Sequence, residues 1–323
     1  MRNWIVCTAV LLGMVRVASA EPLNLKQVPA QAKWVAHVDV DAMRQSTVIQ
    51  KAYYKVADLC PEGEKLLEKV QEFVAMDPRN DLHGITVGGT VVGKREVAVI
   101  IHAEVDQKLL KEKVAKAPDY KAETYGAHQL YSWTDAKGKR HEHAMAGTFF
   151  KSNVIVLAPN VDILKVVLDT LDGKSPSVVG QKSPLAAAVP DGALVLARAV
   201  GLTEAQLPWK SPLLTRSDTF SLVLGEHEGQ SFAEAALVMK SAEDAQRVKA
   251  IVDGGRAMAE LQHGDDAEAM KVLRKLKVSL ADKTLKAEFR APADEVWAQI
   301  EKAGQRIVEH HKKLLEKKAS SKK

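Results

Sequence analysis

The chain has 323 residues, of which 46% are hydrophobic, and this is enough to build one or two cores without cross-links. Its formal net charge of +5 is near balance, so charge alone does not indicate a nucleic-acid partner. The cysteines are Cys7 and Cys60. Because Cys7 falls in a predicted leader, the mature chain excludes an internal disulfide.

Residues 1–20, MRNWIVCTAVLLGMVRVASA, have the three parts of a signal peptide. The basic Arg2 precedes an apolar run, and the small residues at positions 18–20 suit a signal peptidase. The apolar run is too short to span a bilayer. We expect cleavage before Glu21 and export of the mature chain to the periplasm or the cell exterior.

The next elements alternate between hairpins and helices. Residues 33–40 predict a strand, and Asp41 is placed to cap a following helix. Residues 62–75 predict an amphipathic helix, and residues 82–105 predict a hairpin around a Gly-Lys turn. Asp106 then precedes another helix.

From residue 120 the pattern predicts a meander of strands that ends at Asn160, the expected cap of a helix. The stretch 172–184 is rich in glycine, proline and serine, which is typical of a linker.

The same order of elements then returns. Residues 192–201 predict a strand, residues 218–240 predict a hairpin, and Ser241 is the expected cap of the next helix. Gly254-Gly255 predicts a bend or break in that helix. A last hairpin over residues 273–291 precedes a long final helix.

We therefore expect an α+β fold of two tandem pseudo-repeats, in which antiparallel hairpins and a meander carry helices packed on one face. The first lobe would span residues 21–178 and the second residues 179–300. Residues 301–323 would form the end of the last helix and a basic tail.

Three stretches, "AHVDVDAMRQS", "DLHGITVGG" and "LDTLDGKSPS", together with the leader, resemble exported hypothetical proteins of unknown function in bacteria of the planctomycete type. The resemblance extends over most of the mature chain. It implies export and an internal repeat, and it implies no activity.

The stretch "KGKRHEHAMAG" contains the strongest candidate site. In a strand, His141 and His143 point to one side, and two histidines at this spacing bind zinc or copper when further ligands complete the site. Tyr131 and Trp133 would lie across the hairpin and form an aromatic face for a flat or sugar-like ligand. The alternative is a strand end whose polar residues face water.

Three other features have structural explanations. Asp39 and Asp41 have the spacing of a carboxylate cation site, although Asp41 as a helix cap explains one of them. The turn "GEHEG" holds Glu226 and Glu228, which would keep it soluble. A basic cluster, Lys312, Lys313, Lys317 and Lys318, could contact an anionic surface or form only a solvated helix end.

No nucleophile elbow, zincin, phosphate-loop, dinucleotide-binding, EF-hand or CxxC motif occurs in the sequence. The sequence therefore predicts an exported, non-catalytic protein that binds a ligand or a protein partner. The alternatives are a metal-binding protein or metal-dependent enzyme using His141 and His143, and a self-associating envelope scaffold. Bound metal that is lost in His141→Ala/His143→Ala would favour the metal class, and a strictly monomeric mature chain would count against the scaffold.

Overall fold

A computed structural model of the chain describes residues 22–59, 76–92, 96–135, 143–205 and 211–320, together with positions 68 and 71. The helices are η1 Leu25–Gln27, α2 Val40–Gln45, α3 Thr47–Leu59, α5 Gln107–Val114, α6 Val161–Leu171, η2 Pro184–Ala186, η3 Leu202–Glu204, α7 Pro212–Thr215, α8 Ala242–His263, α9 Ala267–Leu273 and α10 Ala293–Ser320. The strands are β1 Trp34–Asp39, β2 Leu82–Gly89, β3 Val97–Ala103, β4 Lys121–Tyr125, β5 His128–Asp135, β6 His143–Lys151, β7 Val154–Ala158, β8 Ala193–Val200, β9 Ser217–His227, β10 Gln230–Met239, β11 Lys277–Ala281 and β12 Thr284–Pro292.

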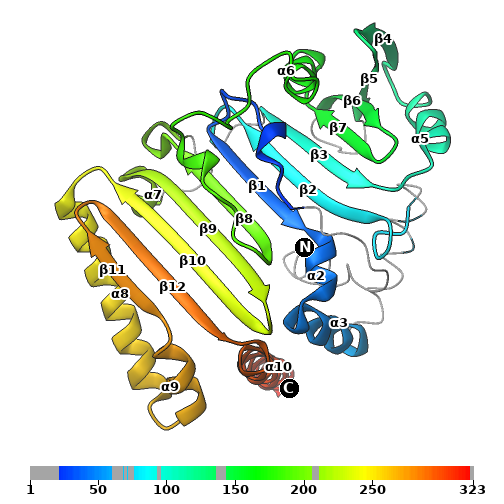
Figure 1. The fold of residues 1–323 in the computed structure, drawn as a ribbon. Coiled ribbons are helices and arrows are strands. Elements are labelled where there is room, and N and C mark those ends of the chain that lie inside the picture. Colours follow the sequence, from blue (N-terminus) through cyan, green and yellow to red (C-terminus); the bar gives the residue numbers. More distant parts are fainter. Residues whose placement is uncertain are drawn as a thin grey trace.

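Within the described residues, these strands form one antiparallel sheet of twelve strands, in the order β11-β12-β10-β9-β8-β1-β2-β3-β7-β6-β5-β4 (Figure 1). The predicted α+β class is therefore confirmed. The two predicted lobes meet inside this sheet, because β1 pairs with β8 over the register Trp34↔Ala199 to Val38↔Val195. A sheet edge exposes unpaired backbone groups, and this pairing satisfies one such edge from each half.

The core at this junction contains residues from both sides of the predicted lobe boundary. Leu23, Val28 and Val35 pack in one cluster with Leu196 and Val223. Two residues of the connecting stretch, Val178 and Leu185, are fully buried in the same cluster. The expectation of a linker over residues 172–184 is therefore wrong at Val178. This residue packs in the core, but the polar residues around it in the sequence give no sign of that.

Arg198 holds the backbone of residues 185–188, which follows Val178 in the chain. Its guanidinium is buried and donates hydrogen bonds to the carbonyl oxygens of Leu185, Ala187 and Ala188 at 3.3, 2.5 and 2.7 Å. Burial lowers the pKa of Arg198 from its ordinary value. The side chain thus ties residues 185–188 to strand β8.

Helices cover both faces of the sheet, so the expectation of helices on one face is wrong. Neighbouring residues of a strand point to opposite faces. Ile100 packs with Leu168 of α6, whereas Ile101 lies beneath α5 together with Val114. Cross-strand pairing through β2, β1, β8, β9, β10 and β12 continues the Ile101 face to Leu285, against which α8 packs. The physical reason is that central strands such as β3, VAVIIHA, are apolar on both faces and need cover on each.

The predicted helix starts at Asp106, Asn160 and Ser241 are confirmed, since each side chain accepts a hydrogen bond from a backbone N–H three residues later. Two helix predictions are wrong. Asp39, not Asp41, caps α2 by accepting from the Ala42 N–H at 2.8 Å. Helix α8 also continues through Gly254-Gly255, because glycine lowers helix propensity by only about 1 kcal/mol without blocking the helical conformation.

Glu226 joins the two halves at the start of α3, so its predicted role in keeping a turn soluble is incomplete. Its carboxylate accepts from the Ser46 hydroxyl at 2.7 Å and from the backbone N–H groups of Thr47 at 2.7 Å and Val48 at 3.2 Å. Helix N-termini carry unpaired N–H groups and a partial positive charge, and a carboxylate satisfies both. Burial would raise the pKa of Glu226, but these hydrogen bonds outweigh it and lower the pKa.

Replacing this cap with an uncharged amide should remove a pH-dependent part of the stability. We expect Glu226→Gln to lower the free energy of unfolding by about 1 kcal/mol at pH 7. A carboxylate with a lowered pKa stabilises the fold above its unfolded pKa of about 4.3 and loses that effect as pH falls through the folded pKa. The difference between wild type and variant, measured by urea unfolding, should therefore shrink between pH 6 and pH 3. Glu228→Gln in the same turn is the control, because its side chain is 85% exposed.

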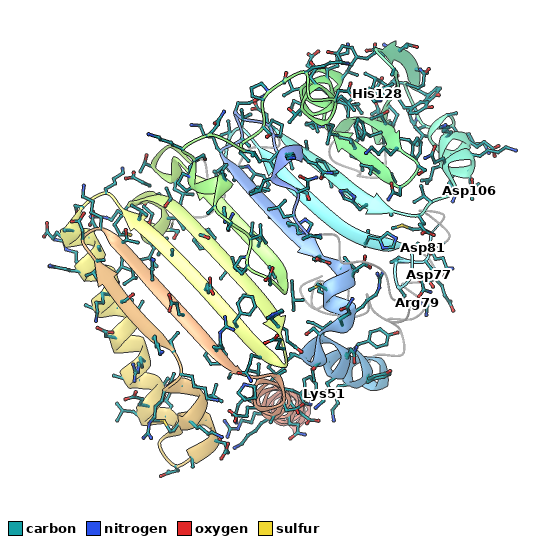
Figure 2. The ribbon with its side chains drawn as sticks, viewed as in Figure 1. Lys51, Asp77, Arg79, Asp81, Asp106 and His128 are labelled. Carbon is teal, nitrogen blue, oxygen red and sulfur yellow. The ribbon has the colours of Figure 1, made fainter. Side chains whose placement is uncertain are left out.

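Helices α3 and α10 lie together at one end of the sheet (Figure 1), where Lys51 pairs with Asp294 and Lys55 with Glu301. Figure 2 shows Lys51 at this junction. Lys312, Lys313, Lys317 and Lys318 belong to α10, but their side chains lie outside the described part, so their contact with an anionic surface stays a prediction. A search of the described residues finds no helix with the length and apolar character to cross a membrane.

Candidate functional site

A cavity of about 510 Å³ lies between α5 and the sheet face formed by β3, β5, β6 and β7. Ile101, Ile155 and Leu157 line it from the inner strands. Small-molecule sites in proteins measure roughly 300–1,000 Å³ and are mostly apolar, so this cavity has the size and the lining of a ligand site.

Aromatic side chains form the wall at the outer strands. Tyr131 and Trp133 alternate along β5 and therefore share a face, and Phe149 stands on β6 beside them. The rings of Tyr131 and Phe149 meet edge to face at 6.3 Å, and Tyr120 stacks on Tyr131 at 6.4 Å. The Tyr131 hydroxyl is neutral at physiological pH, as tyrosines ordinarily are, and burial raises its pKa further. These contacts hold the wall in a fixed shape.

Gly147 occupies the position opposite Tyr131 in the strand register. A Cβ atom there would come within 2.8 Å of Leu157 Cδ2 and 3.4 Å of the Trp133 ring. The missing side chain therefore lets the indole of Trp133 and the side chain of Leu157 approach each other at the cavity wall.

Helix α5 covers the cavity and is tied to the sheet at both ends. At its start, Gln107 donates to the carbonyl oxygens of Lys151 at 3.2 Å and Ser152 at 3.1 Å. Beyond its end, the Thr134 N–H donates to the Pro118 carbonyl at 2.8 Å. Between these ties none of the α5 side chains is fully buried. The helix thus spans a space that its own side chains do not fill.

Lysines supply the charge at this site. Lys111, Lys113 and Lys116 line the cavity, and the Lys111 ammonium lies 5.3 Å from the centre of the Phe149 ring. At this distance a cation interacts favourably with the ring face.

The structure brings together two of the four predicted site residues, Tyr131 and Trp133. His141 lies outside the described residues. His143 begins β6 and pairs with Asp135, while Trp133 pairs with Met145, and the side chain of His143 is not among those described. Zinc or copper binding by His141 and His143 therefore stays a prediction.

Asp39 and Asp41 do not form a pair of free carboxylates. Asp39 caps α2, whereas Asp41 is 2% exposed and forms an ion pair with Arg44. His83 Nδ1 lies 3.0 Å from the Asp41 carboxylate. Among the residues with described placement, no group of three or more His, Cys, Asp or Glu side chains could hold a metal ion.

The Asp41–Arg44 pair sits under a charged turn. Arg44 donates to the carbonyl oxygens of Arg79 at 2.7 Å and Leu82 at 2.5 Å. Asp77, Arg79 and Asp81 gather beside one another in this turn (Figure 2). Burial would raise the pKa of Asp77, but hydrogen bonds from Arg79 outweigh it and lower the pKa. The arrangement is explained by its internal hydrogen bonds, so we assign it a structural role.

Sequence reasoning missed the rest of the cavity. Alternation along β3, β6 and β7 could have placed Ile101, Phe149 and Leu157 on one face, but the match with α5 depends on strand order. Lys111 and Lys116 gave no sequence signal, because lysine is common on exposed helix surfaces.

No family model and no curated protein matches the chain. Among solved structures, crystal form III of the treponemal protein TP0453 is similar with a TM-score of 0.41 and 8% sequence identity, over 88% of this chain and 98% of that chain. Crystal form I of TP0453 has a TM-score of 0.38 and 9% identity, over 88% of this chain and 97% of that chain.

Proposed function

We propose that this chain is an exported, non-catalytic binding protein whose ligand occupies the cavity under α5. The observation that carries the proposal is the apolar space of about 510 Å³ lined by Tyr131 and Trp133. Export is supported by the predicted leader, and the non-catalytic role by the motifs missing from the sequence.

The free-energy cost of leaving an apolar cavity empty supports the presence of a ligand in it. Protein interiors are close-packed, and each surface that loses its neighbouring atoms also loses dispersion energy. An apolar ligand would restore those contacts and gain roughly 25 cal/mol for each Å² of apolar surface removed from water. The hydrogen bonds of Gln107 and Thr134 fix both ends of the α5 segment on the sheet, so the space beneath it exists before the ligand binds.

We also propose that the two lobes, residues 21–178 and 179–300, descend from a duplication. The order β1-β2-β3-β7-β6 in the first half matches the order β8-β9-β10-β12-β11 in the second. Helices α5 and α8 follow corresponding strands, β3 and β10. In this comparison α8 buries Ala245 and Val248 against the sheet, whereas α5 buries no side chain. The difference supports a binding role for the first half alone.

Titration with a neutral, environment-sensitive fluorophore tests the proposed function. N-phenyl-1-naphthylamine added to the purified mature chain should show saturable fluorescence enhancement with one site per chain. Enhancement that never saturates, or no enhancement at all, would contradict a formed cavity. Urea-unfolded chain is the control for nonspecific binding.

A further inference from the structure

The charged side chains that line the cavity are all positive. They are Lys111, Lys113 and Lys116, and none of the described cavity residues is Asp, Glu or His. A lysine ammonium donates hydrogen bonds and accepts none. The charged groups at this site therefore complement an anion and not a cation.

Two of these charges lack an acidic partner within the part of the chain that the structure describes. Neither Lys111 nor Lys116 has a carboxylate oxygen within 4.0 Å, and both side chains are exposed. Other lysines do have such a partner, as Lys271 and Lys275 do with Glu295 at 2.9 and 2.5 Å. The positive charge beside the cavity is thus left available to a ligand.

The aromatic wall adds neutral donors. Neither the Tyr131 hydroxyl nor the Trp133 indole N–H donates to another described residue. The indole nitrogen can only donate. A ligand with acceptor oxygens at one end pairs with the lysines, and its apolar body matches the carbon surface of the aromatic wall.

From these observations, and resting on the proposed function, we propose that the ligand is a long-chain monocarboxylate. Its aliphatic chain lies in the cavity against Ile101, Trp133 and Leu157, and its carboxylate stays at the rim between Lys111 and Lys116. A carboxylate loses much of its hydration energy on burial unless it is paired, which places the charged end at the lysines.

The test compares dodecanoate with 1-dodecanol, which has the same chain without the charge. Both are titrated at low ionic strength into the mature chain loaded with N-phenyl-1-naphthylamine, and displacement gives each affinity. Only dodecanoate can form the two exposed ion pairs, and together they should give it about a fivefold higher affinity than 1-dodecanol. We expect Lys111→Gln/Lys116→Gln to remove this preference without lowering the affinity for dodecanol. The matched control, Lys108→Gln/Lys121→Gln, changes the same charge at exposed residues that do not line the cavity and should keep the preference.

Salt gives a second measurement that needs no variant. Raising the ionic strength should lower the affinity for dodecanoate and leave the affinity for dodecanol unchanged, because salt screens exposed charges. Equal affinity of the two compounds for wild type would overturn the carboxylate proposal and leave the proposed function standing. Failure of the fluorophore and of both compounds to bind would overturn the proposed function itself. If Lys111→Gln/Lys116→Gln still prefers dodecanoate, Lys111 and Lys116 do not bind its carboxylate, and the proposal is overturned.

Discussion

Arg44→Ala is expected to lower the free energy of unfolding by about 3–5 kcal/mol, the cost of breaking a buried ion pair. The Arg44 side chain is 6% exposed and that of Asp41 is 2% exposed, so the remaining carboxylate cannot regain water. The substitution also removes the donor to the carbonyl oxygens of Pro78, Arg79 and Leu82. Burial lowers the pKa of Arg44, and Asp41 acts in the opposite direction.

Urea unfolding followed by circular dichroism measures this loss. Arg247→Ala is the matched control, because Arg247 is 60% exposed and its pair with Glu243 lies on the surface of α8. We expect the control to change stability by less than about 1 kcal/mol. Arg44→Lys should rescue little, since an ammonium cannot reproduce the planar fork that reaches several acceptors. A loss below about 1 kcal/mol in Arg44→Ala would contradict a buried pair at this place.

Leu110→Trp/Val114→Trp is expected to weaken the binding of apolar ligands at least tenfold. Both residues line the cavity from α5, and two indoles there take the space that the ligand needs. The ligand then loses apolar contact worth roughly 25 cal/mol for each Å², and a loss of about 1.4 kcal/mol corresponds to tenfold in affinity. Displacement titration with dodecanoate and 1-dodecanol measures the change.

The control for this pair is Leu109→Trp/Ala115→Trp, which adds the same side chains at exposed positions, one on α5 and one at its C-cap. Neither position lines the cavity, so this variant should bind as wild type does. Urea midpoints of both variants separate a blocked cavity from an unfolded chain. Wild-type affinity in the folded Leu110→Trp/Val114→Trp variant would show that the ligand binds elsewhere.

Local sequence signals predicted most of the elements. Asp106, Asn160 and Ser241 act within one helical turn, so their side chains and the following N–H groups could be matched from the sequence alone. The hairpin β11–β12 has its alternation and its turn in one short stretch.

Long-range contacts were outside the reach of such signals. Glu226 caps a helix that lies about 180 positions away, and the strand pairing between β1 and β8 decides that contact. The cavity likewise required the order β3-β7-β6-β5, which brings Ile101, Leu157 and Trp133 together. Periodicity placed Tyr131 and Trp133 on one face, but it could not show that α5 lies over that face and leaves a space beneath it.

A crystal structure of the mature chain grown with 12-bromododecanoate tests the central claim most directly, because anomalous scattering locates the bromine at the end of the chain. The proposed site predicts a bromine peak inside the cavity, among Ile101, Trp133 and Leu157, with the carboxylate toward Lys111 and Lys116. A cavity closed by α5 and devoid of bromine, with the peak at another surface, would contradict it.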